Sequence, residues 1–437
     1  MRRPGKTGRL IAQVRQIECL FVHVTDFVRN FFISPLKTGR EERRSFFMLL
    51  LRNADLYDPE PRGLSDIVIS AGLILAVCPS GEIPPASFSF AGEELRVVDA
   101  GGDLVMPGII DRHVHFNGAG GEGGPANRTP PLQLSSFVKA GVTSAVGMLG
   151  TDGTCRALED LLMKARGLEE EGISTWILTG SYGIPSPTLT GNVRRDLCLI
   201  DKVIGLKLAV SDHRSSHPSI EEIRRAVSDV RVGGILSGKA GCLCVHMGSE
   251  ATGLTPLLEA IEGTDIPITQ FAPTHISRCE SLVKQSVEFG KRGGYLDITA
   301  APGKNPIFGL STSKVVSGLL ENGVPASNIT LSSDGNGSMP SFNEKGEMTG
   351  LKIGPLDSVF RTVAGMLGTK EFPRSTVISM VTSNPADHLK LPRKGRVCPG
   401  CDGDLLVLDG DFNLRYVAAK GRLLMEEGEV TVRGTFE

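Results

Sequence analysis

Eight short apolar runs alternate with amphipathic segments from residue 104 onward, and this order constrains the fold more than any other feature. The runs are LVMPGIIDRHVH, GVTSAVGML, STWILTGSYG, VIGLKLAVSDH, GCLCVHMG, IPITQFAPTHI, GYLDITA and NITLSSDGNG. Strands that alternate with helical segments are typical of a parallel sheet. Eight such repeats predict a closed (β/α)8 barrel, the TIM-barrel form of the α/β class.

Helices are expected between these runs at residues 158–172, 219–234, 279–294 and 311–323. Ser219 precedes one of them, and Glu222 follows three residues later. This pair has the pattern of a capping box, in which each side chain satisfies a free backbone N–H of the first turn. It predicts that the helix begins at this point.

The segments on either side of the barrel have a different character. Residues 48–106 and 386–437 carry short alternating or β-branched runs that are separated by Gly and Pro. Such runs are typical of short antiparallel strands. We therefore expect both ends of the chain to form one small β-sandwich-like domain, with the barrel of residues 107–385 inserted between them.

Residues 1–47 form a basic N-terminal extension. Residues 1–45 hold ten Lys/Arg and four Asp/Glu, a net charge of +6, so the rest of the chain carries −2 − 6 = −8. Glu18, Asp26 and Arg29 interrupt its apolar residues, which excludes a membrane span and a secretory signal. The extension is interpreted as a transit peptide, a dispensable addition or a mis-set start before Met48.

The net charge and the cysteine content limit which partners the chain can bind and in which compartment it can function. A net charge of −2 over 437 residues gives no sign of nucleic-acid binding, and no membrane partner is expected. The nine cysteines follow no disulfide framework, which favours a reducing, cytoplasmic location. Cys398 and Cys401 form a single C-x-x-C whose Pro-Gly centre favours a tight turn over a metal or redox site.

Six polar residues lie at or near the carboxyl ends of the predicted strands. In a barrel those ends share one mouth, where active sites are built. Residues i and i+2 of a strand point to the same side, so one ion can contact both His113 and His115. The six candidates are His113, His115, Lys207, His246, His275 and Asp334.

Lys207 is the unusual member of this group, because an ammonium inside an apolar strand is costly and cannot bind a cation. It can lose its proton, or it can pair with Asp212. It can also add carbon dioxide and become a carbamate, an anion whose two oxygens can bridge two metal ions. Two divalent ions generate a hydroxide at neutral pH and polarise a carbonyl.

A glycine-dense loop follows the first histidine pair. Gly118, Gly120 and Gly123 match the G-x-G-x-x-G spacing of a dinucleotide loop. A dinucleotide loop is followed at once by a helix whose N-terminus binds the pyrophosphate. Pro125, Pro130 and Pro131 prevent a helix from starting directly after this loop. We therefore expect the glycines to let the backbone approach a small molecule and to place Glu122 beside it.

These residues resemble the amidohydrolase superfamily with a binuclear zinc centre, through PGIIDRHVH, the strand lysine, the two later histidines and SSDGNGS. The loops resemble the isoaspartyl (β-aspartyl) dipeptidase family within it, through GGEGGP, GTD, LTGSY, SDHRS and PTHISR. The resemblance runs from about residue 49 to the C-terminus. It implies zinc-dependent hydrolysis of the isopeptide bond of β-aspartyl dipeptides by a metal-bridging hydroxide, in a homo-oligomer for which an octamer is one form.

The resemblance also implies the roles of individual residues. His113 and His115 would hold one of two Zn²⁺ ions per subunit, and His246 and His275 the other. Lys207, carboxylated by carbon dioxide, would bridge them. Asp334 would bind the first zinc and shuttle the proton, and Tyr182 would polarise the scissile carbonyl. The implied substrate-binding residues are Gly120, Gly121, Glu122, Thr151, Tyr182, Arg214, Arg278 and Ser338.

Two alternatives to this function are open. The first is a cyclic-amide hydrolase or an N-acyl amino acid deacylase on the same scaffold. Glu122 distinguishes the dipeptidase from the cyclic-amide hydrolase, because a cyclic ureide has no ammonium to pair with a carboxylate. The second alternative is a non-catalytic scaffold, which would be expected to have lost metal ligands. All six candidate ligands are present in this sequence.

Overall fold

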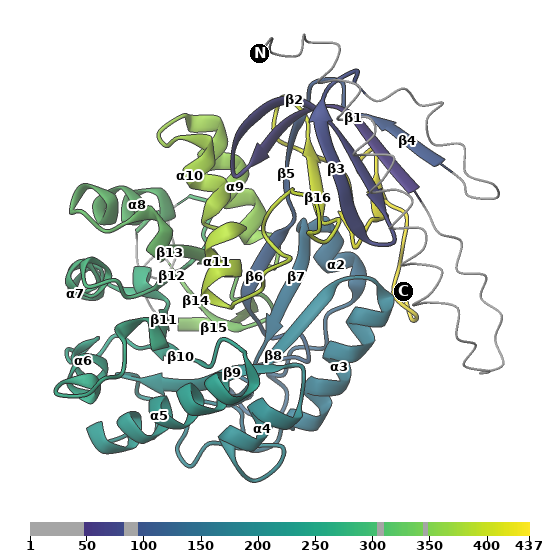
Figure 1. Ribbon diagram of the computed structural model, residues 1–437. Helices are drawn as coiled ribbons and strands as arrows, with labels where there is room; N and C mark the ends of the chain where they lie inside the picture. Colours follow the sequence, from purple (N-terminus) through teal and green to yellow (C-terminus); the bar gives the residue numbers. More distant parts are fainter. Residues whose placement is uncertain (1–47, 83–94, 304–309, 344–347) are drawn as a thin grey trace, which may run out of the picture. The chain divides into compact units, whose positions relative to one another are not determined.

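A computed structural model of the chain describes residues 48–82, 95–303, 310–343 and 348–437. The eight apolar runs form eight parallel strands that curl into a barrel (Figure 1). The strands are β6 (Ile109–Val114), β7 (Val142–Gly147), β8 (Ser174–Gly180), β9 (Val203–Val210), β10 (Cys242–Met247), β11 (Phe271–Thr274), β12 (Leu296–Thr299) and β13 (Ile329–Ser332). The predicted barrel is confirmed. The basic extension, residues 1–47, lies outside the described residues, so the prediction about it stays a prediction.

Strands β6 to β11 form one continuous parallel ladder, and β12 pairs with β13. Two seams close the ring. At the first, Val114 bridges Gly335, and the N–H of His115 donates to the Gly335 carbonyl at 2.9 Å. At the second, the Thr274 hydroxyl donates to the Asp297 carboxylate at 2.7 Å. The carboxyl ends of all eight strands therefore face the same mouth.

Helices follow the strands and cover the outside of the barrel (Figure 1). They are α2 (Leu134–Lys139), α3 (Leu158–Glu171), α4 (Val193–Leu199), α5 (Ile220–Ser237), α6 (Thr255–Ile261), α7 (Glu280–Lys291), α8 (Thr312–Glu321), α9 (Ser358–Thr369), α10 (Arg374–Ser379) and α11 (Ser383–His388). The predicted capping box starts α5: the Ser219 hydroxyl accepts from the Glu222 N–H at 3.3 Å, and the Glu222 carboxylate accepts from the Ser219 N–H at 2.8 Å.

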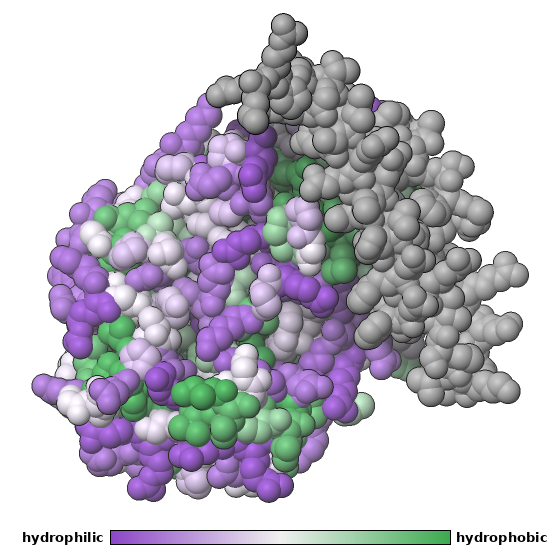
Figure 2. Space-filling view, viewed as in Figure 1, coloured by the Kyte–Doolittle hydropathy of each residue, from purple (hydrophilic) through white to green (hydrophobic). Residues whose placement is uncertain are grey.

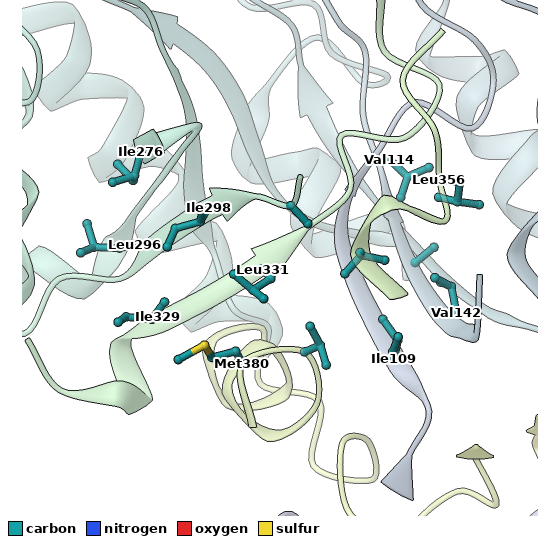
Figure 3. Close-up of a cluster of buried hydrophobic side chains, with 14 of the residues drawn as sticks. Ile109, Val114, Val142, Ile276, Leu296, Ile298, Ile329, Leu331, Leu356 and Met380 are labelled. Atoms are coloured by element: carbon teal, nitrogen blue, oxygen red, sulfur yellow. The ribbon is translucent and has the colours of Figure 1, made fainter. Parts of the chain in front are cut away.

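Apolar side chains fill the space between the strands and the surrounding helices. Figure 3 shows Ile298 and Leu331 on neighbouring strands, with Met380 beside a helix that packs under them. All three are fully buried, and each such side chain contributes roughly 1.5–3 kcal/mol by leaving water. The Leu331 N–H also donates to the Met380 carbonyl at 3.1 Å. The segment after α10 is thus fixed to the strand that precedes Asp334.

The two ends of the chain form one nine-stranded sheet with its own apolar core. Its strands are β1 (Met48–Asp58), β2 (Glu60–Ser70), β3 (Leu73–Pro79), β4 (Leu95–Asp99), β5 (Leu104–Pro107), β16 (Leu405–Leu408), β17 (Leu414–Ala419), β18 (Arg422–Glu426) and β19 (Glu429–Val430). Antiparallel pairing of β5 with β16 joins the N-terminal part to the C-terminal part. The predicted boundary between residues 385 and 386 falls inside α11.

Two local features differ from the expectation. The single run expected at 104–115 is divided at Gly108, with β5 in the sheet of the chain ends and β6 in the barrel. A side chain at Gly108 would come within 2.1 Å of the Thr143 hydroxyl, so only glycine allows this turn. A hairpin of β14 (Ser338–Phe342) and β15 (Met348–Ile353) also follows β13, and its alternation was not recognised in the sequence.

The surface is mostly polar. Figure 2 shows an apolar area over α4 and α5, where Leu199, Ile235 and Leu236 are exposed. Exposed apolar side chains are common on folded proteins, because more than half of a folded surface is apolar. Among the described residues, the longest and most apolar helices are too short or too polar to cross a bilayer.

Candidate active site

The six polar residues predicted from the strand ends lie together at the barrel mouth. A cavity of about 450 Å³ opens there, and its wall includes His115, His246, His275 and Asp334. His113 and Lys207 join the same group: the His113 Nε2 lies 3.2 Å from the Lys207 Nζ and 3.5 Å from an Asp334 carboxylate oxygen. Five strands therefore supply one cluster: three residues lie within β6, β9 and β10, and three follow the ends of β6, β11 and β13.

The four histidine rings pack against each other. Ring centroids lie 5.3 Å apart for His113 and His115, 5.1 Å for His113 and His275, and 4.5 Å for His246 and His275. Burial, and then the neighbouring cationic groups, lower the pKa of His113, His246 and His275 well below the usual histidine value. These three rings are therefore neutral near pH 7, which is the form that binds metal ions.

The outer nitrogen of three rings is held by the protein. The His115 Nδ1 lies 2.9 Å from the Met148 carbonyl, and the His275 Nδ1 lies 2.7 Å from the Thr299 hydroxyl. The His246 Nε2 lies 2.9 Å from the Asp212 carboxylate. Such partners fix the tautomer and orientation of a ligand histidine. The other nitrogen of His115, its Nε2, lies 3.2 Å from an Asp334 oxygen within the cluster, whereas the Nδ1 of His246 lies 2.7 Å from the Tyr182 hydroxyl.

Lys207 is fully buried in β9. Burial lowers the pKa of its amine, and the Asp212 carboxylate binds His246 and Arg214 instead. The proposed ion pair of Lys207 with Asp212 is therefore not formed. A neutral amine is the form that can add carbon dioxide.

Asp334 faces the cluster from the turn after β13, with a left-handed φ of 52°. Burial acts to raise its pKa, but His275, the hydrogen bond from His115 and nearby cationic groups together lower it to about 2. Asp334 is thus ionised. Ligand atoms of His113, His275 and Asp334 lie within 4.8 Å of one another, so this neutral-imidazole and carboxylate set fits a first-row divalent ion.

Tyr182 lies at the wall of the cavity beside His246, with its hydroxyl 2.7 Å from the His246 Nδ1. Burial raises the pKa of the Tyr182 phenol. The hydroxyl therefore keeps its proton and can donate a hydrogen bond to an oxygen in the cavity.

Glu122 lies on the cavity wall and contacts three side chains from distant segments of the chain. The Thr151 and Ser338 hydroxyls each donate to its carboxylate at 2.9 Å, and an Arg214 nitrogen lies 3.4 Å away. Thr151, Ser338 and Arg214 all line the same cavity. A fixed carboxylate in this position can accept a cation from a bound molecule.

The glycine loop places Glu122. Gly120 lines the cavity with a φ of 87°, and a side chain there would meet the Asn127 carbonyl at 2.1 Å. Gly121, also expected at the substrate, is not on the cavity wall; its N–H donates to the Asn127 carbonyl at 2.6 Å. No helix begins directly after the loop, since α2 starts only at Leu134.

Arg214 and Arg278 both line the cavity, and both lie beside Asp212. Asp212 was not among the predicted site residues. It is 2 % exposed and accepts three hydrogen bonds from Arg214, one from the backbone N–H and two from the guanidinium. A carboxylate two residues before an arginine is common on surfaces, so the sequence alone did not single it out.

Comparisons with known proteins agree with this geometry. The β-aspartyl dipeptidase of Fervidobacterium islandicum AW-1, solved in complex with β-Asp-Leu, is 42% identical, with 89% of this chain and 98% of that chain covered and a TM-score of 0.82. A second structure of a β-aspartyl dipeptidase from that organism is 40% identical, with 88% and 98% covered and a TM-score of 0.79. This chain belongs to the β-aspartyl dipeptidase family.

Membership of the β-aspartyl dipeptidase family makes this chain an enzyme of the amidohydrolase superfamily. The model of the amidohydrolase family matches residues 310–430, which contain Asp334. Imidazolonepropionase of Pseudomonas entomophila (strain L48) is 33% identical over 124 residues, which cover 27% of this chain and 29% of that protein. The chain thus matches less than a third of the length of this curated relative.

Proposed function

We propose that this enzyme hydrolyses the isopeptide bond of β-aspartyl dipeptides in a zinc-dependent reaction. The observation that carries the proposal is the Glu122 carboxylate, which Thr151 and Ser338 hold on the wall of the cavity that contains the histidine cluster. A peptidase for a free dipeptide needs both features: a group that meets a free ammonium, and a centre that activates water. The family relationship supports the same substrate class.

Charge matching supports this substrate. A β-aspartyl dipeptide carries one free ammonium and two carboxylates. The cavity wall carries Glu122, Arg214 and Arg278, which are one anion and two cations. Glu122 would bind the ammonium, and the two guanidiniums would bind carboxylates with paired N–H donors. The backbone of Gly120 and the hydroxyls of Thr151 and Ser338 would complete the contacts.

The cluster at the mouth fits two zinc ions by its donor types. His113, His115 and Asp334 would hold one ion, and His246 and His275 would hold the other, with a carboxylated Lys207 between them. Two zinc ions in such a site would supply a hydroxide near neutral pH and polarise the scissile carbonyl. Carbon dioxide is required to form the Lys207 carbamate.

Two residues of the chain would then serve the reaction directly. Asp334, an ionised carboxylate beside the cluster, would accept a proton from the attacking water and pass it to the leaving amine. Tyr182 would donate its hydroxyl proton in a hydrogen bond to the scissile carbonyl oxygen as negative charge develops there. Its raised pKa supports this donor role.

We further propose a cytoplasmic location and a homo-oligomeric assembly, with an octamer as one form. Unpaired thiols support the reducing compartment: the cysteines in the described residues are all free. The assembly rests on the family relationship alone.

A comparison of substrates tests the proposal. Purified enzyme with added zinc is given β-Asp-Leu, α-Asp-Leu and dihydroorotate in parallel. We expect hydrolysis of β-Asp-Leu and little or none of the other two. Preferred turnover of dihydroorotate would favour the cyclic-amide hydrolase, and turnover of an N-acyl amino acid in preference to β-Asp-Leu would favour the deacylase.

A further inference from the structure

The Cys398-Pro-Gly-Cys401 segment forms a tight turn at the surface of the sheet built by the chain ends. The Cys401 N–H donates to the Cys398 carbonyl at 3.0 Å, and Gly400 has a φ of 89°. Proline at the second position and a left-handed glycine at the third are typical of a type II turn. Such a turn brings its first and last Cα atoms within about 7 Å, close to the range that a disulfide spans.

The two thiols of this turn face each other. The Cys398 and Cys401 sulfur atoms lie 2.8 Å apart. Among the described cysteines, these two have sulfurs within hydrogen-bond distance of each other. The predicted turn is therefore present, and it also positions a dithiol.

The turn is fixed to the sheet on both sides. The Gly400 N–H donates to the Ile74 carbonyl at 2.8 Å, and the Ile74 N–H donates to the Cys401 carbonyl at 2.8 Å. These reciprocal bonds to β3 hold the backbone of the turn. The sulfurs can therefore react with each other without a rearrangement of the sheet.

The two thiols differ in access to solvent. Cys398 is half-buried and is followed by the exposed Pro399 and Gly400, whereas Cys401 is 5 % exposed. Burial and the hydrogen bond between the two thiols raise the pKa of the Cys401 thiol to about 12. The difference in exposure makes Cys398 the thiol that a reagent reaches first, and the 2.8 Å between the two sulfurs places Cys401 beside it for the second step.

We propose that Cys398 and Cys401 form a reversible dithiol–disulfide site whose oxidant is a small disulfide. The Cys398 thiolate attacks one sulfur of the oxidant and releases one thiol, which leaves a mixed disulfide on Cys398. The Cys401 sulfur then attacks the Cys398 sulfur, a Cys398–Cys401 bond forms, and the second thiol leaves. The protein loses two hydrogen atoms, and the oxidant is reduced to two thiols.

Mass spectrometry of the full-length enzyme tests this proposal. The reduced, folded protein is incubated with oxidised glutathione, alkylated under denaturing conditions and digested. We expect the peptide that contains both cysteines to be lighter by two hydrogen atoms and to resist alkylation, and dithiothreitol to restore two alkylation sites. In the C401S variant we expect one glutathione on Cys398 instead. C198S, which changes an exposed cysteine, is the matched control and should leave the bond intact.

Other outcomes would overturn the proposal. Alkylation of both cysteines after oxidation, or a stable glutathione adduct on wild-type Cys398, would show that the bond does not form. If zinc protects both thiols from alkylation and EDTA removes that protection, the segment is a metal site instead. A measurement without variants keeps the test independent of folding: phenylarsine oxide, which bridges paired thiols, should protect both cysteines of the reduced wild-type enzyme from alkylation. Free alkylation in its presence would contradict the proposed pair.

Discussion

The Asp212 carboxylate holds the Nε2 of His246 at 2.9 Å with one oxygen and the Arg214 guanidinium at 2.9–3.0 Å with both. One buried side chain therefore orients a ring of the histidine cluster and an arginine of the cavity wall. Burial acts to raise the pKa of Asp212, but the hydrogen bonds of His246 and Arg214 lower it well below the usual range. Asp212 is thus a permanent anion between the proposed metal site and the proposed substrate site.

The variant D212N tests this coupling. An amide keeps the shape of the side chain but loses the charge that holds both partners. We expect zinc affinity to fall by roughly 10- to 100-fold, as for other outer partners of ligand histidines, and KM for β-Asp-Leu to rise at saturating zinc. Competition with a chromogenic chelator measures the affinity. D229N, which changes a surface carboxylate paired with Arg194, should alter neither value. Unchanged affinity and KM in D212N would refute the coupling.

Replacement of Lys207 tests the proposed carbamate. K207A removes the only lysine that is fully buried in the described part of the barrel, and we expect it to lose most zinc and most activity. Short carboxylates such as acetate or propionate should restore part of both, because they can occupy the position of the missing carbamate. Metal analysis and β-Asp-Leu turnover measure the effect. Metal that stays bound in K207A without any carboxylate would argue against a bridging role.

The variant E122Q tests whether Glu122 binds the substrate ammonium. A hydrogen bond to a charged group contributes about 1.5–3 kcal/mol, so E122Q should reduce kcat/KM for β-Asp-Leu by roughly 10- to 150-fold. N-acetylated β-Asp-Leu, which lacks the ammonium, should be a poor substrate for both proteins and should lose little further in E122Q. Steady-state kinetics with the two peptides measure this difference. Equal kcat/KM of E122Q and wild type for β-Asp-Leu would leave the dipeptidase proposal without its main support.

The zinc-free enzyme should lose stability as the pH falls below about 6.5. An unfolded histidine takes up a proton near pH 6.5, whereas burial keeps the pKa of His113, His246 and His275 well below that value. The unfolded state therefore binds more protons, at a cost of up to about 1.4 kcal/mol per histidine and pH unit. Burial also lowers the pKa of His388 well below the usual value, so it acts in the same direction. Asp111 acts in the opposite direction, since burial raises its pKa to about 7, but it is one group against four.

Thermal unfolding of EDTA-treated protein at pH 7.5 and pH 5.5 measures this effect. We expect a lower Tm at pH 5.5. D111N should make the decrease steeper, because it removes the opposing group. A Tm that is constant or rises toward pH 5.5 would show that these rings are not held neutral.

The strand ends were the part of the site that the sequence predicted well. His113 lies at the end of an apolar strand, and His115 and Asp334 follow such strands, so their position at the barrel mouth followed from the parallel topology. The helix start at Ser219 followed from local hydrogen bonding in the same way. Local patterns of this kind need no knowledge of distant contacts.

The residues that hold the histidine rings from other strands were not predictable in the same way, because their roles depend on tertiary contacts. Asp212 and Thr299 hold their histidines across strands, and neither differs in sequence from an ordinary loop or strand residue. The division of one apolar run at Gly108 depends on the position of Thr143 in the next strand. The resemblance implies Gly121 at the substrate, and this stays a prediction; in the structure its N–H donates to the Asn127 carbonyl within the loop.

The first seam of the barrel has a consequence for synthesis of the protein. His115 and Asp334 meet at that seam, although 219 positions separate them in the chain. A nascent chain that has emerged from the ribosome only as far as β12 already carries the four histidines but still lacks the aspartate. At this stage the proposed zinc site would still have an incomplete set of ligands. The proposed centre would therefore be complete only after β13 has emerged and the ring has closed, and zinc retention would then mark completed folding.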